Sequence, residues 1–142
     1  MLTKTTHLDQ KISLLYGPIS RDADSATTTT AINRSTSGSG SLVFVFLCGA
    51  LTASTTLTPS FTESDTLGGS YTAVANSDLS ATPTVFADTD DNKYQAIAYL
   101  GNKAFVKAVL TQAAHAAALV AIIAIESRGN LPMGTAGLVA AI

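Results

Sequence analysis

Short apolar runs separated by turn residues recur along this chain. The clearest is Leu42–Cys48, where seven consecutive apolar residues, rich in Val and Phe, are followed by Gly49. A continuous apolar run of this length between turn signals is typical of a strand buried on both faces. In Thr56–Glu63 apolar and polar residues alternate, which predicts a strand with one buried face. Pro59 places this strand at a sheet edge or a bulge, because proline has no N–H to donate.

The second half of the chain carries further strand patterns. Tyr94–Leu100 and Ala104–Leu110 are separated by three residues that include a glycine, which is the pattern of a β-hairpin. Leu119–Ile125 is rich in β-branched residues and predicts another buried strand. Helix is a competing prediction over 113–125, because alanine-rich segments favour helices and periodicity does not separate the two.

Three shorter segments complete the pattern. Ile12–Tyr16 is apolar and closed by a Gly-Pro turn, Thr27–Ile32 is β-branched, and Tyr71–Ala75 alternates. The total is roughly seven or eight short strands with turns about every 8–12 residues, the spacing of a sandwich or a barrel. The fold class that we expect is therefore mainly β.

The length of 142 residues corresponds to one domain with or without an arm. We expect a single β-sandwich or barrel-like (jelly-roll-like) domain over residues 21–128. Residues 1–20 are expected to form an N-terminal arm or a first strand, and residues 129–142 an extended C-terminal arm.

Charge is scarce and unevenly placed. Charged residues make up 13% of the chain, about half of the usual share. No charge lies between Arg34 and Glu63, between Lys107 and Glu126, or after Arg128. Such stretches are either buried strands joined by Ser and Thr turns, or surface that neighbouring subunits cover. The last stretch is too short to form a core of its own, so its apolar residues are candidate partner contacts: Leu131, Pro132, Met133, Leu138, Val139 and Ile142.

Composition argues against several function classes. The net charge of −2 gives no basic footprint for nucleic acid. One cysteine, Cys48, excludes an internal disulfide and a cysteine-based zinc cluster, and within an apolar run it is expected to be a small buried hydrophobe. With His7 and His115 as the only histidines, we expect no catalysis, no metal and no cofactor.

The start of the chain is polar, unlike a signal peptide. The most apolar stretch, Ala113–Ile125, is shorter than a membrane helix, which needs about 20 residues.

Two acidic segments are candidate sites. Asp88–Asn92 gathers side-chain oxygens as a calcium loop does. The sixth and twelfth positions, which need Gly and Glu in an EF-hand, are Lys93 and Tyr99, so we interpret the segment as a solvated turn, with a weak surface calcium site as the alternative. Glu63 and Asp65 are interpreted as loop charges rather than an acid–base pair.

Several short motifs follow one another in a distinctive order. They are Gly49-Ala-Leu-Thr52, Phe61-Thr-Glu-Ser-Asp65, Tyr71-Thr-Ala-Val74, Asp91-Asn-Lys93, Tyr99-Leu-Gly-Asn-Lys103 and Phe105-Val-Lys-Ala-Val-Leu-Thr111. Over about residues 41–125 this order resembles the minor head or capsid decoration (cement) proteins of tailed bacteriophages. Where that family has Arg-Tyr and a following Arg, this chain has Ala104-Phe105 and Lys107, so contacts of those arginines are not carried over.

The resemblance implies a structural, non-enzymatic virion protein on the capsid surface, assembled in the host cytoplasm. Its implied partners are the major capsid protein and neighbouring copies of itself in a homo-oligomer, with neither nucleic acid nor membrane. Two alternatives stay open: a tail tube or head–tail joining protein, and a carbohydrate-binding β-sandwich. The last would need exposed aromatic residues, and the chain has no Trp and four Tyr.

Overall fold

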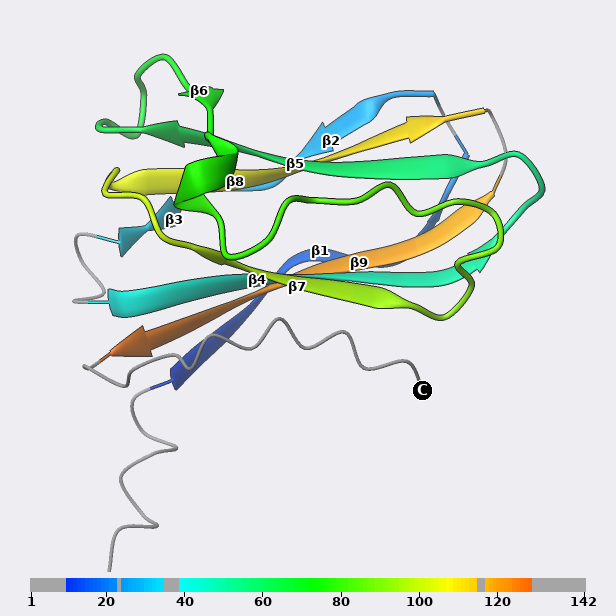
Figure 1. The fold of residues 1–142 in the computed structure, drawn as a ribbon, viewed down its shortest axis with the longest axis horizontal. Helices are drawn as coiled ribbons and strands as arrows, with labels where there is room; N and C mark the ends of the chain where they lie inside the picture. The colour runs from blue at the N-terminus through cyan, green and yellow to red at the C-terminus, as the bar shows by residue number, and fades with distance from the viewer. Residues whose placement is uncertain (1–9, 23, 35–38, 115–116, 129–142) are drawn as a thin grey trace, which may run out of the picture.

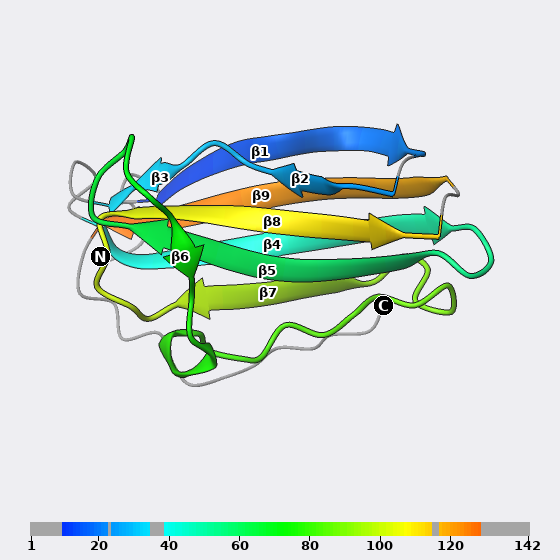
Figure 2. The same cartoon turned by 90° about the horizontal axis from the view of Figure 1, so that it is seen from above.

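The protein folds as two antiparallel β-sheets packed face to face (Figure 1). The computed structural model describes residues 10–22, 24–34, 39–114 and 117–128. The first sheet has the order β1 (Gln10–Arg21), β9 (Ala118–Arg128), β4 (Ser39–Leu51) and β7 (Tyr94–Tyr99). The second sheet has the order β2 (Ala26–Thr28), β8 (Phe105–Ala113), β5 (Thr56–Ser64) and β6 (Thr72–Ala73), and β3 (Ile32–Asn33) also pairs with β8. Figure 2 shows the second sheet lying over the first, with the strands of both sheets running in nearly the same direction.

The expectation of a mainly β sandwich is confirmed. In the segment for which helix competed, Ala113 ends β8 and residues 118–125 lie in β9, while residues 115 and 116 lie outside the described residues. Residues 10–20, expected to be an arm or a first strand, lie in β1 and pair with β9. The 3-10 turn η1 (Asn76–Asp78) lies between β6 and β7, and no described helix is long and apolar enough to cross a membrane.

The predicted hairpin of Tyr94–Leu100 with Ala104–Leu110 is wrong. The two strands, β7 and β8, belong to different sheets: β7 pairs with β4, whereas β8 pairs with β5. The connection between them therefore carries the chain from one layer of the sandwich to the other. A short connection that contains glycine can join two strands of one sheet or two strands of different sheets. Which of the two forms depends on the distant strands that pair with each edge. Tyr94, Tyr99 and Phe105 consequently do not share one hairpin.

The prediction that Leu42–Cys48 is buried on both faces is also wrong. Burial alternates along this part of β4: Phe44 and Phe46 are buried in the core, whereas Val45 between them is half-buried and Leu47 is 38% exposed. The reason is that the second sheet covers only one face of the first sheet. The other face points out of the sandwich.

Three phenylalanines join the two sheets at the centre of the core. The ring of Phe61, from β5, lies 5.2 Å from the ring of Phe44 and 5.6 Å from the ring of Phe46, both from β4. All three side chains are at most 3% exposed. Tilted and edge-to-face ring pairs at such distances add to the free energy of burial.

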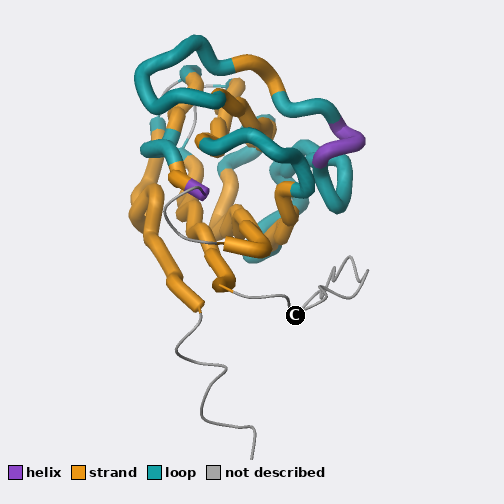
Figure 3. Tube along the Cα trace, turned by 90° about the vertical axis from the view of Figure 1, so that its left-hand side faces the viewer, coloured by secondary structure: helices purple, strands orange, loops and turns teal. Residues whose placement is uncertain are grey.

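Loops cover the free edge of β7. Ala98 exchanges hydrogen bonds with Ser80, and the Gln95 side chain donates to the Thr84 carbonyl and accepts from its N–H. In Figures 2 and 3 this loop, which follows η1, lies along one side of the sandwich.

Pro59 lies where β5 has a partner on one side only, because β6 pairs just with Thr62 and Glu63. The expected edge position of this proline is therefore confirmed.

Candidate functional site

The outer face of the first sheet is apolar across all four strands. The register aligns Ile12 with Ile125 and Val43 in one row, and Leu14 with Ile123 and Val45 in the next. Ala98 and Ala96 of β7 complete these two rows. We define the apolar face as the following residues: Ile12, Leu14, Val43, Val45, Leu47, Ala96, Ala98, Leu119, Ile123 and Ile125.

Several side chains of the apolar face are open to solvent. Ile12 is 68% exposed, Leu14 61% and Leu119 45%. The two central rows contain no charged or polar residue, although Lys11 and Ser13 alternate with Ile12 and Leu14 along β1. Contiguous apolar surface of this kind marks sites of contact with another surface.

The outer face of the second sheet provides an internal comparison. There, Thr58 lies opposite Thr111, Ser60 opposite Val109 and Thr62 opposite Lys107, so this face is mainly polar. Threonine forms strands as readily as valine does, so strand formation alone does not require apolar residues on an outer face. The apolar character of the first sheet's outer face is therefore not a requirement of strand formation.

A polar cluster at one end of the sandwich ties the sheets together. The Tyr99 hydroxyl donates to Glu63 Oε2 at 2.5 Å and accepts from the Lys103 N–H at 3.0 Å. Burial, followed by the bond to Glu63, raises the pKa of Tyr99 to about 12. The Arg34 guanidinium lies 4.8 Å from the centre of the ring. Glycine is needed at 101, since a Cβ there would collide with the ring and hydroxyl of Tyr99.

Glu63 and Asp65 have different partners in this cluster. Glu63 accepts a hydrogen bond from the Tyr99 hydroxyl, whereas the exposed Asp65 forms an ion pair with Lys103 Nζ at 2.8 Å. Hydrogen bonding to Asp65 raises the pKa of Lys103. The two carboxylates thus have different partners, which favours the interpretation of structural loop charges over that of an acid–base pair.

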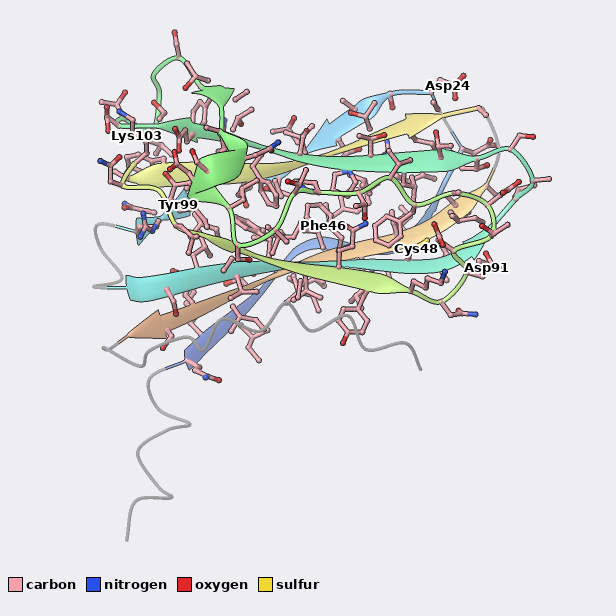
Figure 4. All side chains as sticks on the ribbon, in the orientation of Figure 1. Asp24, Phe46, Cys48, Asp91, Tyr99 and Lys103 are labelled. Atoms are coloured by element: carbon pink, nitrogen blue, oxygen red, sulfur yellow. The ribbon has the colours of Figure 1, made fainter. Side chains whose placement is uncertain are left out.

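Cys48 lies toward the opposite end of the sandwich (Figure 4). Its side chain is 5% exposed and belongs to the core, as expected for a small buried hydrophobe. Burial, with smaller contributions from Asp91 and Asp90, raises the pKa of the thiol to about 11. The reactive thiolate is therefore scarce at neutral pH.

Carboxylates of the acidic segment beside Cys48 accept hydrogen bonds from the end of β4 and from the turn that follows it. Asp91 Oδ1 accepts from the Leu51 N–H at 2.7 Å, and Asp88 Oδ2 accepts from the Ser54 N–H at 2.8 Å. Asp90 accepts from Lys93, which lowers the pKa of its carboxyl. Over the described ranges, no three His, Cys, Asp or Glu side chains come together as metal ligands would. The geometry favours the turn over the calcium site.

Replacing Asp91 by alanine is expected to lower the free energy of unfolding by about 1–2 kcal/mol, because the Leu51 N–H loses a charged acceptor. Urea unfolding measures the change. Asp24→Ala is the matched control, since Asp24 is an exposed aspartate in another turn, and its effect should stay within about 0.5 kcal/mol. A rise in thermal stability of the unmodified protein on adding calcium would instead support the metal site.

One cavity of about 310 Å³ lies between the loop after η1 and β7, lined among others by Val85, Phe86, Tyr94 and Ile97. Its lining is mainly apolar, and Tyr94 is its one tyrosine. A sugar would need an exposed aromatic ring to stack on, and of the two aromatic residues in the lining Phe86 is only 3% exposed.

The remaining candidates from the sequence lie outside the described residues: His7, His115 and the contact set Leu131, Pro132, Met133, Leu138, Val139 and Ile142. Conversely, the sequence pattern did not reveal the apolar face, because its members were assigned to buried strands. The signal that could have found it is the row of apolar residues at alternate positions, which continues along β4 and β9 on the side opposite the core.

By its fold this chain is a two-sheet antiparallel β-sandwich. Compared with known protein families, curated proteins and solved structures, it matches none.

Proposed function

We propose that this protein is a structural, non-enzymatic decoration (cement) protein on the outer surface of a tailed-phage capsid. Its proposed partners are the major capsid protein and neighbouring copies of itself. The observation that carries the proposal is the apolar face, a broad uncharged surface on one side of a small rigid sandwich. The order of short motifs along residues 41–125, which resembles decoration proteins, supplies the biological setting.

The physical requirements of cement fit such a surface. A decoration protein stabilises a shell by burying area across subunits, and symmetry repeats each contact many times. Each contact can therefore be weak. For scale, a standard specific interface buries about 800 Å² per partner. Side chains held on a paired sheet lose little conformational freedom on binding, in contrast to those on a loop. The C-terminal residues Leu131, Pro132, Met133, Leu138, Val139 and Ile142 are proposed to add to this contact.

The test is binding to capsids assembled without this protein. We expect the wild-type chain to sediment with capsids, and Val45→Lys to weaken binding at least about tenfold, because a charge buried in an apolar contact is costly. Thr58→Lys places the same charge on the outer face of the second sheet and should bind like the wild type. Thermal unfolding verifies that both variants fold.

Three outcomes would contradict the proposal: absence of a 14.5 kDa component from purified virions, location of the protein in a tail tube or joining ring by electron microscopy, or equal binding of the two lysine variants. The second outcome would support the tail or head–tail joining alternative.

A further inference from the structure

The apolar face leaves large side chains in contact with water in the isolated chain. Ile12, Leu14 and Leu119 are each at least 45% exposed and lie on two neighbouring strands. We propose that the C-terminal segment of the same chain, residues 129–142, docks on the apolar face. This inference concerns the protein on its own and does not depend on the proposed capsid role.

The segment starts beside the surface that it is proposed to cover. It follows Arg128, the last residue of β9, and β9 lies inside the first sheet between β1 and β4. Gly129-Asn130 follows at once, and both residue types favour chain reversal. The segment therefore needs no linker to return over the sheet from which it leaves.

Its length matches the face. β4, with 13 residues, is the longest strand of the first sheet, and at about 3.3 Å per residue it spans roughly 43 Å. The 12 residues that follow the Gly129-Asn130 reversal reach about 40–43 Å when extended. The segment is thus long enough to run along the apolar face from one end to the other.

Its chemistry also matches. The segment has no charged side chain, so docking does not remove a charged group from water. Leu131 and Met133 are two residues apart, as are Leu138, Ala140 and Ile142. Because side chains alternate along extended backbone, Leu138, Ala140 and Ile142 would face the sheet together. Leu131 and Met133 would face it as well only if the backbone between Gly134 and Gly137 shifts the alternation by one residue.

Covalent attachment favours the chain's own segment over a second molecule. A segment joined directly to the sheet has an effective concentration in the millimolar range, above that of a second copy in dilute solution.

The experiment measures how well the full chain protects a thiol on the apolar face. Val45→Cys is introduced together with Cys48→Ala, and the rate of reaction with a maleimide is followed. The same chain carrying Leu138→Asp and Ile142→Asp, which should prevent docking, is the comparison. We expect at least a tenfold slower reaction with the native segment, since only the undocked fraction reacts, and tenfold corresponds to about 1.4 kcal/mol of docking free energy.

Thr58→Cys, on the outer face of the second sheet, is the matched control and should react at one rate with either segment. Leu119→Cys is a second reporter, should Val45→Cys fail to fold. Equal rates with the native and the substituted segment would overturn the proposal. Protection that weakens on dilution would also overturn it, because it would show that a second copy covers the face.

Discussion

Phe61→Ala is expected to lower the free energy of unfolding by about 3–5 kcal/mol, more than any other substitution proposed for this protein. Phe61 is 3% exposed and contacts Phe44 and Phe46 across the two sheets. Its loss removes apolar area and leaves a cavity between layers that the strand pairings hold apart. Because a small domain is stable by about 5–15 kcal/mol, this one change removes a large part of its stability.

Urea unfolding followed by circular dichroism measures this effect. Phe61→Leu, which keeps most of the buried volume, should cost clearly less than Phe61→Ala. Leu67→Ala is the surface control, because Leu67 is 64% exposed, and it should change stability by less than about 0.5 kcal/mol. An effect of Phe61→Ala as small as that of Leu67→Ala would mean that the aromatic contact between the sheets is not formed.

Tyr99→Phe is expected to cost about 1–3 kcal/mol at neutral pH, because Glu63 and the Lys103 N–H lose their hydrogen-bond partner. The loss should shrink at high pH. Since the pKa of Tyr99 is raised from 10.0 to about 12, the folded protein keeps the phenol proton in a range where the unfolded chain releases it. The hydroxyl's contribution is therefore fully present below pH 10 and is lost as pH rises towards 12.

The measurement is the difference in unfolding free energy between the wild type and Tyr99→Phe from about pH 8 to about pH 12, a range that runs from below the ordinary pKa of the phenol up to the raised one. We expect the difference to narrow above pH 10, the ordinary pKa of the phenol. Glu63→Gln keeps an oxygen that accepts the phenol proton but removes the negative charge, so it should show an intermediate pattern. A difference that stays constant over the whole range would contradict the buried hydrogen bond.

Strand positions were predicted well where the sequence alternates or is densely β-branched. The alternation of Thr56–Glu63 recurs in β5, and the β-branched run Leu119–Ile125 lies within β9. These signals are local, because a strand's side chains alternate between its two faces regardless of which strand lies beside it. Thr27–Ile32 was less accurate: it is divided into β2 and β3, both of which pair with β8.

The candidate site was not predictable in the same way. Val45 belongs to an unbroken apolar run, so its sequence environment is the same as that of the buried Phe44 and Phe46. Whether a side chain in such a run meets a second layer depends on the side from which that layer packs. Glu63 and Tyr99 are 36 residues apart, and no local pattern links them.

The sequence by itself determined that this chain is mainly β, with a sandwich or a barrel left open, that Cys48 is buried, and that Asp88–Asn92 makes a turn, because each of these depends on residues close together in the chain. Only the tertiary structure decided that β7 and β8 join different sheets and that one outer face is apolar while the other is polar. Sheet membership and exposure follow from pairings between distant segments. Those pairings are chosen by competition for edges and core area over the whole chain, which no local pattern contains.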